Sequence, residues 1–294
     1  MAKAAERYYS LSPQMRLPKM GAMNAAHIDS NTAAALTGPG HEVFILGVVV
    51  AVFLLAGLVK GVVGLGLPTL SMGLLASVMP PAHAAVILIL PSFLTNAWQM
   101  WDGAALGRLV RRLWPLQLGV LAGTLWAPVS LVTLNANVAS AGLGAALMVY
   151  AVLGLAAVSL SVPRRGERFS SGATGLITGA ITAATGVFVF PAVPYLQALH
   201  LKKDELVQAL GLSFTVSTVA LFGRLALEGS FSADAVPGGW GWLAALPAAL
   251  LGMAAGQMLR GRLDEKAFKR LFFTGLLAIG LYMVIGSAIR WLAG

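Results

Sequence analysis

Lys60 is the first residue inside a long apolar stretch whose side chain could do chemistry. It lies near the end of an apolar run that begins at Val43. An ionisable side chain within a membrane is a functional candidate by default. Such a lysine could attract an anionic substrate or change its protonation state. The alternative is a lysine at a helix end whose ammonium reaches the membrane interface. The sequence leaves both interpretations open.

Two bends rich in glycine and proline interrupt the apolar stretches in a similar way. The first has Gly64 and Gly66 before a proline, and the second has Thr185 and Gly186 before a proline. Glycine lets the backbone turn and approach other atoms closely, and proline suits the first turn of a helix. A short helix should therefore begin near each proline, with its free N–H groups and positive dipole end facing the bend. Two such ends that meet would favour an anion; the alternative is two proline kinks without a ligand.

Small polar residues in two apolar stretches could complete such a pocket. Asn96 lies in the run from Pro91 to Gln99, and the corresponding run of the second half holds Ser213 and Ser217. These side chains can donate hydrogen bonds to an oxyanion without adding charge, although each could equally bond a neighbouring helix. The predicted substrate-binding residues are Lys60, Gly64, Gly66, Asn96, Thr185, Gly186, Ser213 and Ser217.

Enzyme chemistry has little support in the sequence. The chain has no cysteine, and its four histidines are scattered. Ser213 follows Gly211 and Leu212, but no histidine lies near a plausible base position, and the expected membrane crossings contain no Asp or Glu. We therefore expect no catalytic residue, no metal site and no cofactor.

The composition is typical of a polytopic membrane protein. Of 294 residues, 58% are apolar and 11% are charged, with a mean hydropathy of +0.81, whereas soluble domains carry about 25% charged residues. The net charge is +9. Most basic residues lie in short loops between apolar runs, where they orient the chain in a membrane. We therefore expect no binding to nucleic acid.

Six apolar stretches are long enough to cross a bilayer, which takes about 20 residues. Loops rich in Lys and Arg alternate along the chain with loops that have none, so the positive-inside rule places the basic loops in the cytoplasm. The predicted crossings are Ala82–Trp101, Leu113–Leu134, Val138–Leu160, Leu206–Leu227, Trp240–Leu259 and Leu271–Trp291.

Two further segments, Val43–Met79 and Gly172–His200, fit poorly as simple crossings. Basic loops precede and follow the second segment, yet it is too short to cross twice. It should therefore enter and leave the membrane on the cytoplasmic side. The first segment is its expected partner on the opposite side, although it is nearly long enough to cross twice. The N-terminus is then predicted to lie outside.

The two halves share short motifs in the same order, which indicates an internal duplication. Gly57-Leu58-Val59-Lys60-Gly61 corresponds to Gly175-Leu176-Ile177-Thr178-Gly179, and a GxxxG pair for close helix packing recurs at Gly119/Gly123 and Gly252/Gly256. Each half would hold one re-entrant helical hairpin and three transmembrane helices, so the second half is inverted relative to the first. Inverted repeats of this kind are typical of transporters.

The predicted fold class is therefore an all-α polytopic membrane protein with two inverted repeats. Its expected parts are a polar, disordered N-terminal extension without a cleaved leader (1–42), a first transmembrane repeat (43–162), a cytoplasmic linker (163–171) and a second transmembrane repeat (172–294).

The motifs resemble those of the TauE/SafE sulfite exporter family of membrane permeases (TSUP). The resemblance covers about Val43 to Trp291 and rests on three motifs: Gly57-x-x-Lys60-Gly61-x-x-Gly64-x-Gly66, Thr182-x-x-Thr185-Gly186-Val187-Phe188 and Pro191-x-x-Pro194-Tyr195-Leu196. It implies a multi-pass carrier of the bacterial plasma (inner) membrane for small anions, often sulfur-containing, with Lys60, Gly64, Gly66, Thr185 and Gly186 in the pocket. Many relatives have a run of glycines where this chain has Gly66-Leu67-Pro68, which puts the substrate class in question more than the fold.

Together these observations predict a secondary transporter that moves a small, sulfur-containing or organic anion by alternating access. The alternative is a non-transporting membrane scaffold or assembly factor. The expected partners are a small anionic substrate and the lipid bilayer, and a homodimer is left open. Direction of transport and coupling ion do not follow from the sequence.

Overall fold

The computed structural model describes residues 39–156, 161–231 and 241–293. The chain divides between Glu42 and Val43 into two units, and the description concerns the second unit. The described residues form helices and contain no strand. The predicted all-α class is thereby confirmed. The predicted N-terminal extension lies outside the described residues except for its last four.

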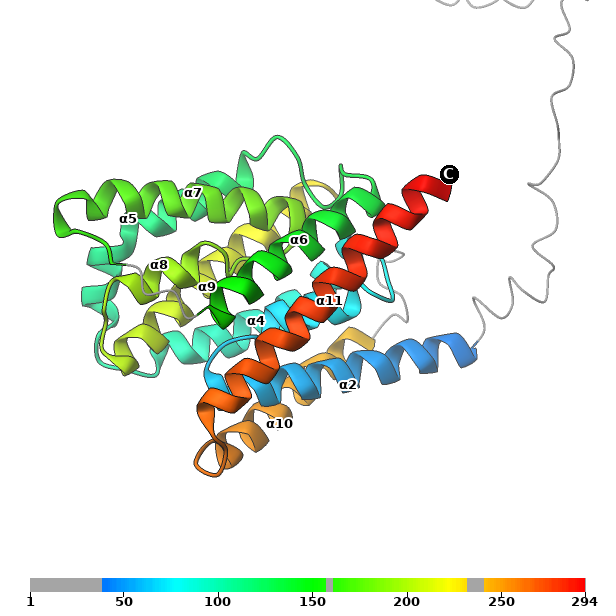
Figure 1. Cartoon of the computed structure of the whole chain (residues 1–294), viewed down its shortest axis with the longest axis horizontal. Coiled ribbons are helices and arrows are strands. Elements are labelled where there is room, and N and C mark those ends of the chain that lie inside the picture. Colours follow the sequence, from blue (N-terminus) through cyan, green and yellow to red (C-terminus); the bar gives the residue numbers. More distant parts are fainter. Residues whose placement is uncertain (1–38, 157–160, 232–240, 294) are drawn as a thin grey trace, which may run out of the picture. The chain divides into compact units, whose positions relative to one another are not determined.

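The two halves of the chain have the same order of helices (Figure 1). In each half a long helix is followed by a break, a short helix and three long helices. The first half holds α2 (Pro39–Val63), α3 (Leu67–Leu75), α4 (Pro81–Trp101), α5 (Leu106–Leu125) and α6 (Ala136–Leu155). A 3₁₀ turn, η1 (Arg164–Gly166), then precedes α7 (Glu167–Thr185), α8 (Ala192–Ala198), α9 (Lys203–Leu227), α10 (Gly241–Arg260) and α11 (Glu265–Ala293).

Six of the described helices, α2, α4, α6, α9, α10 and α11, are long and apolar enough to cross a membrane. Five of them coincide with predicted crossings, with bounds that differ by a few residues. The sixth helix, α2, belongs to a segment that the sequence does not predict as a simple crossing. The predicted crossing Leu113–Leu134 corresponds instead to α5, which begins earlier, at Leu106, and ends at Leu125. The charge pattern predicts a loop for the arginines near its start, Arg108, Arg111 and Arg112, but arginine is a good helix former. Its end precedes Pro128, and proline disfavours a helical residue before it.

The first broken segment differs from the expected hairpin, because its two arms are unequal. Helix α2 has 25 residues and α3 has 9, so the first arm alone is long enough to cross. The run after Val43 contains no proline that would end a helix before Gly64. There the backbone turns, with positive φ at Gly64 and Gly66. Helix α3 begins at Leu67 and has Pro68 in its first turn, as the sequence predicts.

The second broken segment has arms of 19 and 7 residues, α7 and α8. Helix α7 ends where Gly186 adopts a left-handed conformation, a common way for a helix to stop. Helix α8 follows directly after Pro191. Both breaks therefore fall where glycine and proline predict them.

Glycine faces join each long arm to a helix of the other half. A methyl group added to Gly57 or Gly61 of α2 would collide with the backbone of α10, and one added to Gly119 or Gly123 of α5 would collide with the backbone of α7. The close packing predicted for the GxxxG pairs is therefore confirmed. Helix α4 packs against α9 and α6 against α11. Figure 1 shows α5 beside α7 and α6 beside α11.

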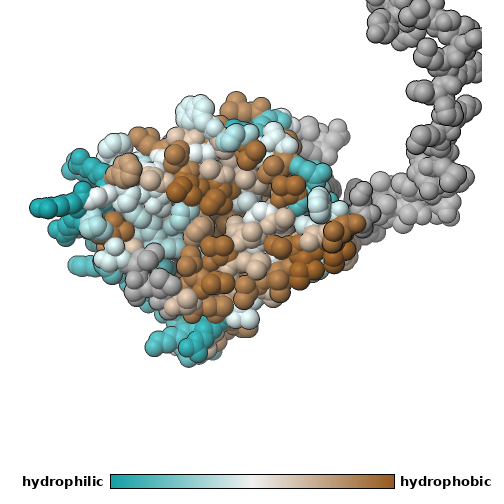
Figure 2. Space-filling model, turned by 45° about the horizontal axis from the view of Figure 1, so that its top comes forward, coloured by the Kyte–Doolittle hydropathy of each residue, from teal (hydrophilic) through white to brown (hydrophobic). Residues whose placement is uncertain are grey.

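Ion pairs connect the loops that the charge pattern groups together. Arg108 at the start of α5 pairs with Glu205 of α9 at 2.6 Å, and Arg112 pairs with Glu167 of α7 at 2.5 Å. The loops of the other group meet elsewhere, where the side chain of Ser130 donates to Glu228 at 2.9 Å. Figure 2 shows hydrophobic residues across the middle and lower right of one face and hydrophilic residues gathered at its left end and at the bottom. These contacts bring the basic loops together in one place and the loops without Lys or Arg together in another. The side of the membrane on which each group lies stays a prediction.

Candidate functional site

Lys60 lies one turn before the end of α2 and points into the protein. Its side chain is buried, at 4% exposure. The ammonium donates hydrogen bonds to the hydroxyl of Thr95, at 3.2 Å, and to the side-chain oxygen of Asn96. Both acceptors belong to α4. The interpretation of Lys60 as a lysine that reaches the interface is therefore wrong.

The buried ammonium has only neutral oxygens around it. Within the described residues no Asp or Glu forms an ion pair with Lys60. A buried charge without an opposite charge is costly, and a buried ammonium held only by neutral groups is a favourable place for an incoming anion.

Polar atoms without a protein partner lie on the same part of α4 and on the short helix that packs against it. The side-chain oxygen of Asn96 accepts from Lys60, whereas the amide nitrogen of Asn96 is buried and has no hydrogen-bond partner. The hydroxyl of Ser92, one turn earlier on α4, is also buried and unpaired, as is that of Thr69 on α3. A buried unpaired polar group costs about 1–3 kcal/mol. These donors therefore mark a region that suits a hydrogen-bond acceptor.

The first bend is held in place by Gln99, one turn beyond Thr95 and Asn96 on α4. The amide of Gln99 donates to the carbonyl oxygen of Gly64 at 3.2 Å and to that of Val207 in α9 at 2.9 Å. The N–H of Gly64 in turn donates to the carbonyl oxygen of Lys60 at 2.7 Å. Gly66 approaches Phe272 of α11 so closely that a methyl group there would crowd the ring. The sequence shows Gln99 as one of the polar side chains of the run from Pro91 to Gln99, but its bonds to the bend follow only from the structure.

The second bend is enclosed by apolar side chains. Thr185 donates to the carbonyl oxygen of Ile181 and accepts from the N–H of Val187, so its hydroxyl shapes the turn. A methyl group on Gly186 would crowd Met72 and Leu131. Met72 belongs to α3, so the second bend lies against the short helix that begins at the first bend. The N–H of Leu131 donates to the carbonyl oxygen of Ala183, in the last turn of α7, at 2.8 Å.

Ser213 and Ser217 lie on the buried part of α9, at 1% exposure each. The hydroxyl of Ser213 accepts a hydrogen bond from the amide of Gln117 in α5 at 2.9 Å. In this conformation Ser213 therefore links two helices, and neither serine borders the cavity described next.

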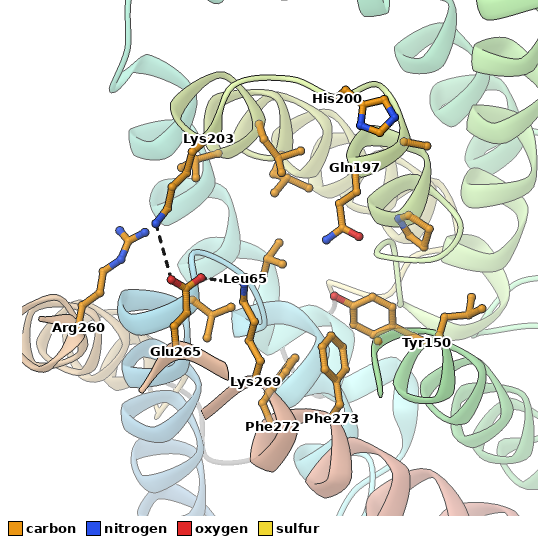
Figure 3. A pocket seen from close by; sticks show the side chains of 18 residues that line it. Leu65, Tyr150, Gln197, His200, Lys203, Arg260, Glu265, Lys269, Phe272 and Phe273 are labelled. Carbon is orange, nitrogen blue, oxygen red and sulfur yellow. Dashed lines mark ion pairs between the residues drawn. The ribbon is translucent and has the colours of Figure 1, made fainter. Parts of the chain in front are cut away.

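A cavity of about 420 Å³ lies beside the first bend, and we refer to it as the vestibule. Val63 and Leu65 border it at the bend, and α6, α8, α9, α10 and α11 supply the remaining walls. Figure 3 shows Gln197 and Tyr150 on one side, opposite the charged side chains. The polar side chains that line the vestibule are Tyr150, Gln197, His200, Lys203, Arg260, Glu265 and Lys269.

The vestibule is rich in basic side chains, and none of its polar lining residues is among the substrate-binding residues predicted from the sequence. Lys203, Arg260 and Lys269 are cations, and Glu265 is the one carboxylate among the described lining residues. The sequence did show these basic residues, but only as loop charges that orient the chain. Which of them face one cavity depends on how α9, α10 and α11 converge, and that follows only from the structure.

The profile of the sulfite exporter TauE/SafE family matches residues 49–283. The chain belongs to the sulfite exporter TauE/SafE family. The match begins within α2 and ends within α11, so it includes both bends and all eight predicted site residues. No curated protein and no solved structure matches the chain significantly.

Membership of the TauE/SafE family confirms the resemblance seen in the sequence and places the chain among anion permeases. Six apolar helices of sufficient length accompany the match. The chain is therefore a multi-pass integral membrane protein. For a bacterial transporter, the membrane is the plasma membrane. In this TauE/SafE protein Lys60 does not border the vestibule, whereas Val63, one turn later in α2, does.

Proposed function

We propose that the chain is a secondary carrier that moves a small sulfur-containing or organic anion across the plasma membrane by alternating access. The observation that carries the proposal is the buried Lys60 ammonium, which has only the neutral oxygens of Thr95 and Asn96 as partners and lies one helical turn from a basic vestibule. An anion that reaches this ammonium would supply the missing negative charge.

The inner binding site in this proposal is built around Lys60 and Asn96. Lys60 supplies the charge, and the amide nitrogen of Asn96 donates to a substrate oxygen. Hydrogen bonds in which one partner is charged are stronger than neutral ones. The unpaired hydroxyls of Ser92 and Thr69 are further donors within the same pair of helices, α3 and α4. A compact oxyanion, which accepts several hydrogen bonds at once, suits this set of donors.

Access in this conformation would be from the end where the basic loops gather. The vestibule is lined by Lys203, Arg260 and Lys269 from those loops. The other end is tied by Arg224 of α9, which donates to the carbonyl oxygen of Leu125 at 2.6 Å and pairs with Glu228 at 2.7 Å. Glu228 also accepts from Ser130. We therefore assign this structure to the state that faces the basic loops.

The opposite state would follow from the duplicated order of helices. In inverted-repeat carriers the two halves exchange conformations, so the second bend would become accessible when the first is enclosed. Thr185, Gly186, Ser213 and Ser217 belong to the substrate path in that second state under this proposal. Residues 43–162 and 172–294 are then the two repeats, and the linker 163–171 joins them.

Transport assays in proteoliposomes test the proposal. Folded protein should move sulfite, sulfoacetate or a related small anion, and replacing Lys60 with Met should stop this flux. Lys202→Met is the matched control, because Lys202 is a lysine that does not line the vestibule. Absence of flux for every such anion with folded wild-type protein would favour the scaffold or assembly factor.

A further inference from the structure

The two lysines of the vestibule already hold a carboxylate from the protein itself. Glu265 in the first turn of α11 lies 2.7 Å from the ammonium of Lys269 and 3.7 Å from that of Lys203 (Figure 3). Lys269 is on the same helix, whereas Lys203 is the first residue of α9. The carboxylate thus bridges two helices at the wall of the vestibule.

The carboxylate of Glu265 lies between the ammonium groups of Lys203 and Lys269, where a bound anion would be expected. Among the described residues that line the vestibule, the cations Lys203, Arg260 and Lys269 gather on one side, and Glu265 is the single acid between them. A free anion that approaches from the basic loops would meet the same two ammonium groups. It can engage them fully only if the carboxylate gives way.

The contacts of Glu265 are weak enough to exchange. Its side chain is 43% exposed, and those of Lys203 and Lys269 are 66% and 44% exposed. Exposed ion pairs contribute little to stability, because water screens them and long side chains lose freedom. The carboxylate can therefore swing into water without disturbing the packing of α11.

We propose that Glu265 is a tethered competitor that occupies the anion site of the vestibule until a substrate anion displaces it. The inference rests on the proposed function, since it needs a vestibule that receives anions. Displacement exchanges one negative charge for another at Lys203 and Lys269. Glu265 thereby sets the affinity that an anion must have to be admitted towards Lys60, and its loss from Lys203 releases the link between α9 and α11.

The test compares Glu265→Gln with Asp264→Asn in the full-length chain. Asp264 is the adjacent acid, it does not line the vestibule, and it caps α11 by accepting from the N–H of Lys266. Asparagine keeps that cap, so both variants remove one negative charge from the same turn. Binding of sodium sulfite and sodium sulfate to purified protein is measured by calorimetry, and thermal unfolding verifies folding. Glu265→Ala is a second variant should Glu265→Gln fold poorly.

Glu265→Gln should lower the dissociation constant by about twofold to tenfold, the range expected when one or two exposed ion pairs no longer compete. Asp264→Asn should leave it unchanged. The gain should disappear in a Lys203→Met/Lys269→Met background, because Glu265 acts through those lysines. Equal affinities of the two single variants, or a gain that persists without the lysines, would overturn the role of Glu265 and leave the proposed function standing. Wild-type protein that neither binds nor transports these anions would overturn both.

Discussion

The ammonium of Lys60 on α2 donates to the side-chain oxygen of Asn96 on α4, and this bond orients the unpaired amide nitrogen of Asn96 into the buried interior. The two residues lie 36 positions apart in the chain. Their pairing brings one charge and one unpaired donor together between α2 and α4.

Replacing Lys60 with Met should weaken anion binding without unfolding the protein. A hydrogen bond to a charged group contributes about 1.5–3 kcal/mol, so the dissociation constant for sulfite should rise by at least about tenfold. Apolar replacement of a buried charge is often neutral or stabilising, so the melting temperature should not fall markedly. Calorimetry and thermal unfolding measure both quantities. Unchanged affinity in this variant would remove Lys60 from the site.

Replacing Asn96 with Asp should abolish binding in a different way. The new carboxylate would lie beside the Lys60 ammonium and neutralise it, and an internal ion pair leaves nothing for an external anion. Flux in proteoliposomes should therefore fall below a tenth of the wild-type rate. Ser170→Ala, on an exposed turn of α7, is the control and should transport normally. Retained flux in Asn96→Asp would show that the anion takes another route.

A large residue at Gly57 should destabilise the protein, because its methyl group alone would meet the carbonyl oxygen of Ala249 in α10. Overpacking costs about 1–3 kcal/mol. Gly47 on the same helix has no neighbour within 4 Å, so Gly47→Leu is the control. Gly57→Leu should lower the melting temperature in detergent while Gly47→Leu leaves it in place. Equal melting temperatures would mean that α2 and α10 are not in close contact.

Replacing Arg224 with Ala should shift the carrier away from the state described here. The change removes the bond to the carbonyl oxygen of Leu125 and the pair with Glu228, which tie the end opposite the vestibule. A cysteine at Leu65, which borders the vestibule, should then react more slowly with a polar maleimide. Arg290→Ala, which loses only contacts to Asn137 and Ser287, should leave the rate unchanged. Faster labelling after the Arg224 change would reverse the assignment of this state.

The orientation in the membrane is tested by two single cysteines in this naturally cysteine-free chain. The positive-inside rule places the basic loops in the cytoplasm. A cysteine at Asn135 should react with an impermeant reagent added to intact cells, and a cysteine at Gly166 should react only after lysis. The reverse pattern would invert the orientation.

The sequence was informative wherever a local pattern decides the structure. Apolar runs predict the long helices, and glycine followed by proline predicts both breaks. Spaced glycines predict the packing of α5 and α10, because only glycine allows two backbones to come so close. These features depend on a few neighbouring residues and can therefore be predicted from one sequence.

The features that were missed depend on contacts between distant segments. The basic pattern predicts a loop for the arginines at the start of α5, because a charge pattern does not show where a helix begins. Glycine and proline predict the second bend but not the side chains around Gly186, which are Met72 of α3 and Leu131. The vestibule residues Tyr150, Gln197 and Glu265 come from three helices. No spacing within the chain could have brought them together.

A structure of the protein soaked with selenite, whose selenium scatters anomalously, tests the central claim most directly. Selenite resembles sulfite in charge and shape, so its position can be located beside named atoms. We predict an anomalous peak beside Lys60 and Asn96, with selenite oxygens within hydrogen-bonding distance of the Lys60 ammonium and the amide nitrogen of Asn96. A saturated crystal with selenium elsewhere and none beside Lys60 would contradict the account.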